Sequence, residues 1–487
     1  EQLQTSYRFL RRVENHIQQY QDKQTHDLPA DPLVQNILAF SMDYPDWQSF
    51  KSKLDAVRKE VHSVFDQVFS LSDQAEIKDS SEIVWSGSSD EDCIEFLEQH
   101  GFLQAKESLT QLKHFKNSRA VSRLTSKGAD VINRLIPQLI DQIQDVDNKD
   151  ATLIRVLALF EQVAGRNVYL SLLAENPKAL SQLITLSSAS PWICEYLAQY
   201  PVLFDELLDT RSLYDPLNKT QLSSQLQASL QTIDNEDVEQ LMITLRQFKH
   251  LNILRIAAAD IMHVIPVMVV SDYLTYVAEV ILEAVIDRAW KLLTAKHGLP
   301  PNSSDAHKAF GILGFGKLGG IELGYGSDLD MVFLYHCKDG NAMTDGGKPI
   351  GCSQFYGRLG QKVRHILDTK MLSGLLYEVD LRLRPSGDSG LLVTHIDVYE
   401  DYLKNNAWTW EHQALVRGRF VAGDIELEPE YEAIRERILG LSRNKNELKN
   451  EVQEMRDKMR QALAKKESEL FDLKQSIGGI VDIEFIV

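Results

Sequence analysis

Residues 314–335 read Gly-Phe-Gly-Lys-Leu-Gly-Gly-Ile-Glu-Leu-Gly-Tyr-Gly-Ser-Asp-Leu-Asp-Met-Val-Phe-Leu-Tyr, and this stretch decides the fold of the segment around it. An apolar run at Phe310–Leu313 precedes it and a second run at Leu329–Tyr335 ends it, so a strand is expected on each side of a glycine-rich connection. Three of the glycines match the dinucleotide fingerprint G-x-G-x-x-G, but that fold requires a full helix next and an acidic residue at the far end of the second strand. The segment here is short and interrupted by glycines, and no Gly-Lys-Ser/Thr closes it as in a P-loop. Both of these nucleotide folds are therefore disfavoured.

Two carboxylates stand at the start of the second strand. Because side chains alternate along a strand, Asp328 and Asp330 are expected on one face and the apolar residues on the other. Two acids one strand step apart can bind Mg²⁺ through oxygen ligands, while substrate phosphates fill the remaining octahedral positions. An isolated Asp-x-Asp is also common at a helix N-cap or a solvated strand start, so it is weak evidence alone.

A second charged strand strengthens the case. The alternation in Leu376–Arg384 predicts Glu378, Asp380, Arg382 and Arg384 on one face of a strand. Two metal ions that assist an in-line displacement need a third carboxylate, which Asp380 can supply, either as ligand or as base for an attacking hydroxyl. The two arginines would neutralise phosphate charge. The alternative is a surface strand with ion pairs.

The order and spacing of Gly319-Gly320, Asp328-Leu-Asp330 and Asp380 resemble the nucleotidyltransferase superfamily of the DNA polymerase β type. Four longer strings resemble the adenylyl transferase half of the glutamine synthetase adenylyltransferase (glutamate–ammonia-ligase adenylyltransferase) family. They are residues 316–330, 377–387, 407–417 and 478–485.

This resemblance implies a set of site residues. The family pattern makes Asp328, Asp330 and Asp380 both the catalytic carboxylates and the metal ligands, with two Mg²⁺ ions expected and Mn²⁺ possible. It also places Gly319, Gly320 and Ser327 on the nucleotide phosphates. Spacing and charge add Lys317, Arg382 and Arg384 to the triphosphate site. A cluster of aromatic and polar residues at Trp408, Trp410, Glu411 and His412 is compatible with a ligand contact or with a packed helix start, and is left out of the site.

The resemblance also implies a reaction and partners. The expected enzyme is a nucleotidyltransferase that moves AMP from ATP to a tyrosine of glutamine synthetase, releases pyrophosphate and lowers the activity of that enzyme in nitrogen regulation. Glutamine and the PII signal protein are the expected regulators. Two alternatives remain: a uridylyl-type enzyme acting on another signalling protein, and a helical scaffold that senses ATP without turnover.

The expected fold class is α+β, a mostly helical chain carrying a polymerase-β-like nucleotidyltransferase domain with a small mixed sheet and flanking helices. Helical periodicity fills residues 1–70, which resemble the tail of a bundle that follows the AMP-removing half of the family enzyme. A Ser- and acid-rich linker is expected over 71–92. A helical region over 93–300 includes a helix expected to start at Ser271-Asp272, and the nucleotidyltransferase domain follows over 301–425. Residues 426–487 look like a truncated helical region, and the chain looks like part of a longer protein.

Composition bounds the function classes. The 487 residues include 52 Lys and Arg against 70 Asp and Glu, a net charge of −18 that disfavours nucleic acid and anionic membranes as partners. The longest apolar run is far shorter than a membrane span. The 4 cysteines lie far apart without metal-ligand spacing, which favours neither disulfides nor zinc and indicates a reducing, cytoplasmic compartment.

Overall fold

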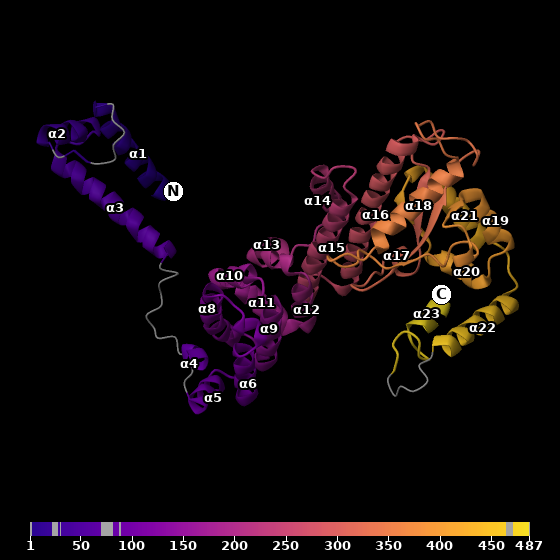
Figure 1. Ribbon diagram of the computed structural model, residues 1–487, viewed down its shortest axis with the longest axis horizontal. Helices are drawn as coiled ribbons and strands as arrows, with labels where there is room; N and C mark the ends of the chain where they lie inside the picture. The colour runs from indigo at the N-terminus through magenta and orange to yellow at the C-terminus, as the bar shows by residue number, and fades with distance from the viewer. Residues whose placement is uncertain are drawn as a thin grey trace. The chain divides into compact units, whose positions relative to one another are not determined.

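The computed structural model describes residues 2–21, 28–29, 31–69, 81–86, 89–463 and 471–486. The chain divides into two compact units, Glu1–Phe96 and Leu97–Val487. Figure 1 labels helices of both units and colours the chain from indigo at the N-terminus to yellow at the C-terminus.

The first unit is helical, with α1 (Gln2–Gln21), α2 (Pro32–Ser41) and α3 (Trp47–Phe69). The carboxylate of Asp31 accepts a hydrogen bond from the Leu33 N–H at 2.8 Å, and Pro32 begins the helix, which is the usual N-terminal arrangement. Phe50 is fully buried and packs against three aromatic rings, so this unit has a core of its own. The other members of this core include Val13, Leu38, Ala39, Met42 and Leu54.

The linker expected over 71–92 is partly helical. Residues 70–80, 87 and 88 lie outside the described residues, but α4 (Ser81–Ser86) and the start of α5 (Asp90–Gln99) fall inside the expected linker. Val84 and Trp85 are buried, and the Cys93 thiol bonds to the carbonyl of Ile83. The prediction overlooked these two apolar side chains, which give the Ser-rich segment a surface to bury.

The second unit begins with a helical region. Its helices are α6 (Ala105–Lys116), α7 (Arg119–Ser122), α8 (Ser126–Gln142), α9 (Lys149–Val163), α10 (Asn167–Glu175), α11 (Pro177–Ala189), α12 (Pro191–Gln199), α13 (Thr210–Leu213), α14 (Lys219–Gln231), α15 (Val238–Ile261) and α16 (Val267–His297). The start expected for the last of these was wrong, because Pro266 holds an extended backbone directly before Val267 and the helix begins there.

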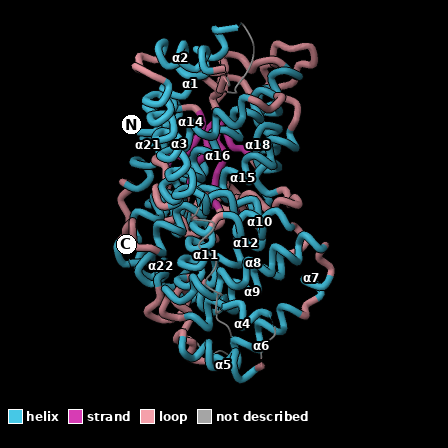
Figure 2. The backbone as a smooth tube through the Cα atoms, turned by 90° about the vertical axis from the view of Figure 1, so that its left-hand side faces the viewer, coloured by secondary structure: helices cyan, strands magenta, loops and turns pink. Residues whose placement is uncertain are grey.

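The sheet that follows has five strands in a mixed arrangement: β1 (Phe310–Gly314), β2 (Leu329–Tyr335), β3 (Val379–Asp380), β4 (Val393–His395) and β5 (Arg419–Gly423). β1 pairs antiparallel with β2 and with β5, while β2 pairs parallel with β3 at its start and with β4 at its end. The tube in Figure 2 is mostly helical, with the strands in magenta as a small part of it. The predicted α+β class and the positions of the first two strands are confirmed.

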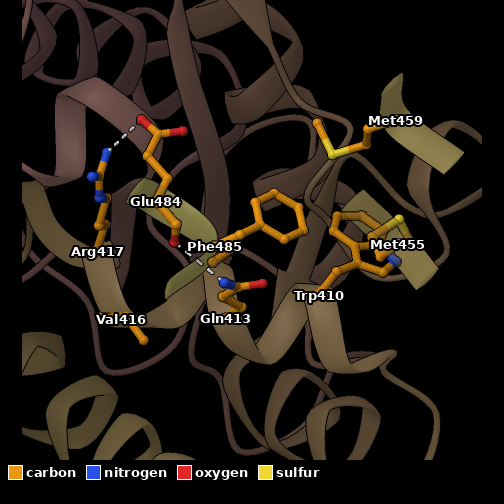
Figure 3. A pocket seen from close by; sticks show the side chains of 9 residues that line it. Trp410, Gln413, Val416, Arg417, Met455, Met459, Glu484 and Phe485 are labelled. Carbon is orange, nitrogen blue, oxygen red and sulfur yellow. Dashed lines mark hydrogen bonds and ion pairs between the residues drawn. The ribbon is translucent and has the colours of Figure 1, made fainter. Parts of the chain in front are cut away.

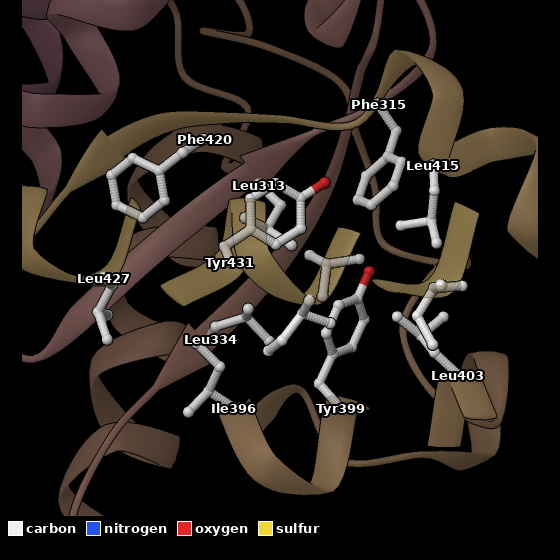
Figure 4. Packing of buried hydrophobic residues seen from close by; sticks show 13 residues of the cluster. Leu313, Phe315, Leu334, Ile396, Tyr399, Leu403, Leu415, Phe420, Leu427 and Tyr431 are labelled. Atoms are coloured by element: carbon white, nitrogen blue, oxygen red, sulfur yellow. The ribbon is translucent and has the colours of Figure 1, made fainter. Parts of the chain in front are cut away.

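Helices cover both faces of this sheet. On one face Leu313, Val332 and Leu334 pack against α19 (Ile396–Asn405) and α21 (Glu428–Leu439), with Tyr399 and Tyr431 at the centre of the cluster (Figure 4). The remaining members of the cluster are Phe315, Ile396, Leu403, Leu415, Phe420, Leu427, Ile434 and Ile438.

On the other face the ring of Phe310 lies near those of Phe333 and Tyr356. Tyr356 belongs to α18 (Cys352–Asp368), which approaches so closely that a Cβ on Gly360 would lie 2.3 Å from a methyl of Val393. Because both faces of the sheet are buried, every residue of β2 after Asp330 is apolar or aromatic.

The chain continues through α20 (Thr409–Ala414), α22 (Lys445–Leu463) and α23 (Ile480–Ile486). Short 3₁₀ turns lie at Ile143–Asp145, Pro201–Leu208, Gly387–Ser389, Leu415–Arg417 and Ile425–Leu427. Among the described residues, no helix has both the length and the apolar character needed to cross a membrane.

Candidate active site

Three carboxylates meet where β2 and β3 begin to pair. The parallel register sets Asp330 opposite Asp380, and the N–H of Leu329 donates to the carbonyl of Glu378 at 2.9 Å. Asp328 directly precedes β2 and reaches the same place. Oxygen atoms of Asp328, Asp330 and Asp380 all lie within 4.8 Å of one another. The structure therefore brings together the three acids that the sequence singled out.

Local sequence explains how β1 and β2 aim Asp330. The two strands pair antiparallel up to Gly314 and Met331, and the N–H of Phe315 then donates to the carbonyl of Asp330 at 2.9 Å. The one-turn helix α17 (Gly316–Gly319) follows at once and lies beside this carboxylate. Asp330 and Asp380 thus stand on paired strands, and Asp328 lies in the turn directly before β2.

The environments of the carboxylates differ. Burial, together with the negative charges of Asp328 and Asp380, raises the pKa of Asp330 to about 6. The pKa of Asp380 is lowered instead, chiefly by hydrogen bonds from the Arg382 side chain. A carboxylate with a lowered pKa is a weak base at neutral pH, so Asp380 is better suited to be a ligand than a proton acceptor.

The strand expected over Leu376–Arg384 was wrong in length, because β3 comprises Val379 and Asp380 alone. The N–H of Arg382 donates to the Asp380 carboxylate at 2.9 Å, which bends the chain out of the extended conformation. Ser386 then adopts a left-handed backbone with φ 63°. The alternation argument for the two arginines therefore fails beyond Asp380.

Both arginines nevertheless line the same cavity as two of the carboxylates, Asp328 and Asp380. This cavity of about 330 Å³ includes Asp328, Asp380, Arg382 and Arg384 in its wall. Arg382 donates from Nε to both oxygens of Asp380 at 3.0 and 2.9 Å. Arg384 is held by the carbonyl of Leu381, and its buried Nε has no hydrogen-bond partner among the described residues. Arg384 Nη2 also pairs with the exposed carboxylate of Asp388 at 3.4 Å, and an anionic ligand can compete with that carboxylate for the guanidinium.

Further polar residues of the cavity wall were missed by the sequence analysis. Arg364, Glu378 and Asp388 also line it. Glu378 carried a signal, because it stands two residues before Asp380 and was placed on the charged face. Arg364 lies on α18 and Asp388 in the turn after β3, and no local spacing linked either residue to the acids.

The glycines of the connection have distinct structural roles. Gly316 has φ +50°, and a Cβ there would lie 2.3 Å from Oδ2 of Asp330, so this position requires glycine. A Cβ on Gly319 would lie 2.0 Å from the carbonyl oxygen of Arg417. The N–H groups of Gly319 and Gly320 already donate to the carbonyls of Phe315 and Gly316. The expected use of these two N–H groups for phosphate is therefore not favoured, whereas Gly316 was missed and adjoins the acids.

The two remaining residues of the expected phosphate site are close in sequence to the acids. Ser327 accepts a hydrogen bond from the Gly324 N–H at 2.9 Å, which closes a turn directly before Asp328. Lys317 is exposed on α17. Their contacts with phosphate stay predictions.

The donor set fits divalent cations. Among the described residues, these three acids are the one group of His, Cys, Asp or Glu side chains compact enough to hold a metal ion. Oxygen-only ligands suit Mg²⁺ or Mn²⁺. The raised pKa of Asp330 reflects crowded negative charge that a cation would relieve.

The cluster at Trp408–His412 is a packed helix start, as one of the two interpretations held. Glu411 is buried and accepts hydrogen bonds from the Trp408 N–H and the Tyr402 hydroxyl, both at 2.8 Å. His412 contacts the carbonyl of Leu403.

Trp410 lines a separate cavity of about 240 Å³ with Met455, Met459 and Phe485. Figure 3 shows these side chains on one side and the Arg417–Glu484 ion pair on the other.

Carboxylates of Asp330 and Asp380 on paired strands, with Asp328 beside them and a glycine turn next to them, match the site expected from the resemblance to nucleotidyltransferases of the polymerase β type. A family model described as glutamate-ammonia ligase adenylyltransferase matches residues 180–434, more than half of the chain and all of this site. The chain belongs to that family. A second model, described as GlnD PII-uridylyltransferase, matches residues 1–69.

Curated relatives agree over the whole chain. It is 49% identical to a bifunctional glutamine synthetase adenylyltransferase/adenylyl-removing enzyme of Methylococcus capsulatus over 99% of this chain and 51% of the relative. Enzymes with the same name from Nitrosococcus oceani and Thioalkalivibrio sulfidiphilus are 46% and 44% identical over 100% of this chain and 51% and 52% of their own lengths. The chain thus spans about half the length of these relatives.

Proposed function

We propose that this chain transfers AMP from ATP to a tyrosine hydroxyl of glutamine synthetase and releases pyrophosphate. The observation that carries this function is the register of β2 and β3, which places Asp330 opposite Asp380 within reach of Asp328. The names of the relatives, which pair adenylyltransferase with glutamine synthetase, support the choice of nucleotide and protein substrate.

The transfer is an in-line displacement at the α-phosphorus. The tyrosine oxygen forms a bond to phosphorus, the bond to the bridging oxygen of the β-phosphate breaks, and pyrophosphate leaves. Such a reaction depends mainly on positioning and charge neutralisation. Arg384, whose Nε lacks a partner among the described residues, and Arg382, which holds Asp380, would bind the phosphates.

Mg²⁺ or Mn²⁺ held by Asp328, Asp330 and Asp380 would neutralise charge on the phosphates and the leaving pyrophosphate. The chain's own part is to hold the three carboxylates within 4.8 Å and to leave room for phosphate in the adjoining cavity. We assign Ser327 to the phosphates on the strength of the family pattern and Lys317 on the strength of its spacing and charge. The N–H groups of Gly319 and Gly320 are already bonded within the chain, so these two glycines shape the turn beside the acids.

The family resemblance supports glutamine and the PII signal protein as regulators that act through this activity. The four cysteines are present as thiols, which together with an ATP-dependent reaction suits a cytoplasmic location. The uridylyl alternative is weakened because the uridylyltransferase model matches residues 1–69 and not the carboxylate site. We therefore expect ATP to be preferred over UTP.

The first test is transfer of label to purified glutamine synthetase from ATP labelled at the α-phosphate, with ATP labelled at the γ-phosphate in parallel. Asp330→Asn keeps the shape of the side chain but removes its charge, so we expect transfer to fall at least about 10³-fold. The protein should remain folded by circular dichroism.

Asp209→Asn is the matched control, because Asp209 is an N-cap of the helical region whose bond to the Arg211 N–H an asparagine can still accept. Near-normal turnover by Asp330→Asn would sink the carboxylate assignment. ATP binding without any transfer by the parent chain would favour the scaffold alternative.

A further inference from the structure

Helix α15 of the helical region bonds to both segments that carry the catalytic carboxylates. Three of its side chains, Arg246, Lys249 and Asp260, reach out of the helical region. Lys249 and Asp260 are 11 positions apart, which is close to three full turns, so they project from the same side of the helix about 16 Å apart.

The first attachment holds the segment that leads into Asp380. Arg246 donates from Nε to the carbonyl of Gly374 at 2.9 Å and from Nη2 to the carbonyl of Thr369. The Lys249 ammonium donates to the carbonyl of Leu376, and it lies 4.0 Å from the ring centroid of Tyr377. β3 is two residues long, so its own ladder provides few bonds, and the placement of Asp380 depends on these contacts.

The second attachment holds the turn that leads into Asp328. The Tyr325 hydroxyl donates to Oδ2 of Asp260 at 2.8 Å. The Tyr325 ring also packs against Trp192 of α12 at a centroid distance of 5.4 Å. Tyr325 stands three residues before Asp328, and its neighbour Gly326 has nothing within 4 Å of a built Cβ. The tyrosine thus anchors this turn, which has open space at Gly326.

Stability alone does not account for these contacts. Arg246 is completely buried, and burial together with its charge lowers the pKa of Lys249 to about 8. Among the described residues, both cations bind carbonyls or a ring and neither forms an ion pair with a carboxylate. Burial of two adjacent cations in this way costs free energy that an apolar pair would avoid.

We propose that α15 sets the spacing between the Asp328 and Asp380 segments, with Lys249 and the Asp260–Tyr325 pair as positioning residues of the metal site. The helical region is then a working part of the catalytic apparatus, because a shift of α15 moves both carboxylate segments together. This inference rests on the proposed function for its kinetic readout, but not for its metal-binding readout.

The test uses the full chain with three substitutions: Tyr325→Phe, Lys249→Met and Asp260→Asn. Binding of Mn²⁺ alone is measured by electron paramagnetic resonance, and the half-saturating Mg²⁺ concentration by AMP transfer. Tyr325→Phe and Lys249→Met each remove one anchor. Each should raise the dissociation constant for Mn²⁺ and the half-saturating Mg²⁺ concentration about fivefold or more, as expected for one lost hydrogen bond. Asp260→Asn retains an oxygen that can accept from the Tyr325 hydroxyl, so it should weaken metal binding less than Tyr325→Phe does.

Two control substitutions remove comparable bonds that end within the helical region. Arg255→Met breaks an ion pair of α15 with Glu206, and Tyr214→Phe removes a tyrosine hydroxyl that donates to Gln182. Both substitutions should lower the melting temperature without changing the Mn²⁺ affinity or the half-saturating Mg²⁺ concentration.

The inference is overturned if Tyr325→Phe, once shown to be folded, loses stability while its Mn²⁺ affinity stays unchanged. It is also overturned if the two controls shift the metal response as much as the anchors do. If the parent chain transfers no AMP but the substitutions at Tyr325 and Lys249 still weaken Mn²⁺ binding, the proposed function fails and the positioning role stands.

Discussion

Asp330 sits among negative charges that the nearby cations Arg382 and Lys474 offset only in part. Its pKa of about 6 lies well above the ordinary 3.8, because burial and two neighbouring carboxylates disfavour its charged form. Arg382 lowers the pKa of Asp380, so the third acid stays ionised at lower pH than Asp330 does. Holding these negative charges together where a cation would bind therefore lowers the free energy of unfolding of the metal-free chain.

This crowding predicts how stability changes with pH in metal-free buffer. A raised folded-state pKa means that the native chain binds the proton more tightly than the unfolded chain, so stability falls as pH rises from about 4 to about 6. Asp330→Asn lacks this loss, so it should melt at a higher temperature than the parent at pH 7.5, with a shift of roughly 2–4 °C per kcal/mol. The two proteins should melt alike near pH 4.

Calorimetry at both pH values, with and without Mg²⁺, checks this prediction. Added Mg²⁺ should stabilise the parent and leave Asp330→Asn unmoved, because the variant lacks a ligand. A lower melting temperature for the variant at pH 7.5 without metal would contradict the proposed crowding.

At the scale of elements, the connection between β1 and β2 opens with a single helical turn, whose first residue, Gly316, has no room for a side chain. Gly316 combines a positive φ with contact to Asp330, while the turn around Ser327 aims Asp328. β3 contributes Asp380 through a two-residue pairing. Short elements therefore carry the chemistry, and longer helices hold them.

Gly316→Ala should damage activity more than fold. A Cβ 2.3 Å from the Asp330 carboxylate must displace it, and the left-handed backbone adds about 1 kcal/mol or more of strain. We expect AMP transfer to fall at least about 10²-fold with a modest loss in melting temperature. Gly326→Ala is the control from the same connection, because nothing lies within 4 Å of its built Cβ. Equal effects of the two changes would refute a special role for Gly316.

At the scale of the molecule, the chain forms two units with separate cores. The first unit has Phe50 at the centre of its aromatic cluster, and the second buries the sheet between helices on both faces. The carboxylate site and the helix that braces it both belong to the second unit. The first unit should therefore unfold without affecting ligand binding by the second unit.

Differential scanning calorimetry should resolve two transitions. Mg²⁺ with ATP should stabilise the second unit, raising its free energy of unfolding by about 2.7 kcal/mol at a ligand concentration of one hundred times Kd. Phe50→Ala should destabilise the first unit, lowering its free energy of unfolding by about 3–5 kcal/mol, and leave ATP binding intact. A single transition that responds to both changes would show that the two units unfold together.

The sequence by itself determined the local parts of this protein. The change to period-2 alternation located β1 and β2, and the spacing of glycines and acids identified the carboxylates, because these features depend on neighbouring residues. It also placed the chain in the right fold class and family.

Tertiary structure alone decided how the parts meet. The pairing of Asp330 with Asp380 joins residues 50 positions apart, and the bonds of Lys249 and Asp260 span still longer separations. The expected strand beyond Asp380 failed because the Asp380 carboxylate accepts a hydrogen bond from the Arg382 N–H, which favours a turn over the extended backbone. Alternation describes one strand, whereas register, turns and long-range hydrogen bonds depend on the free energy of the whole packed chain.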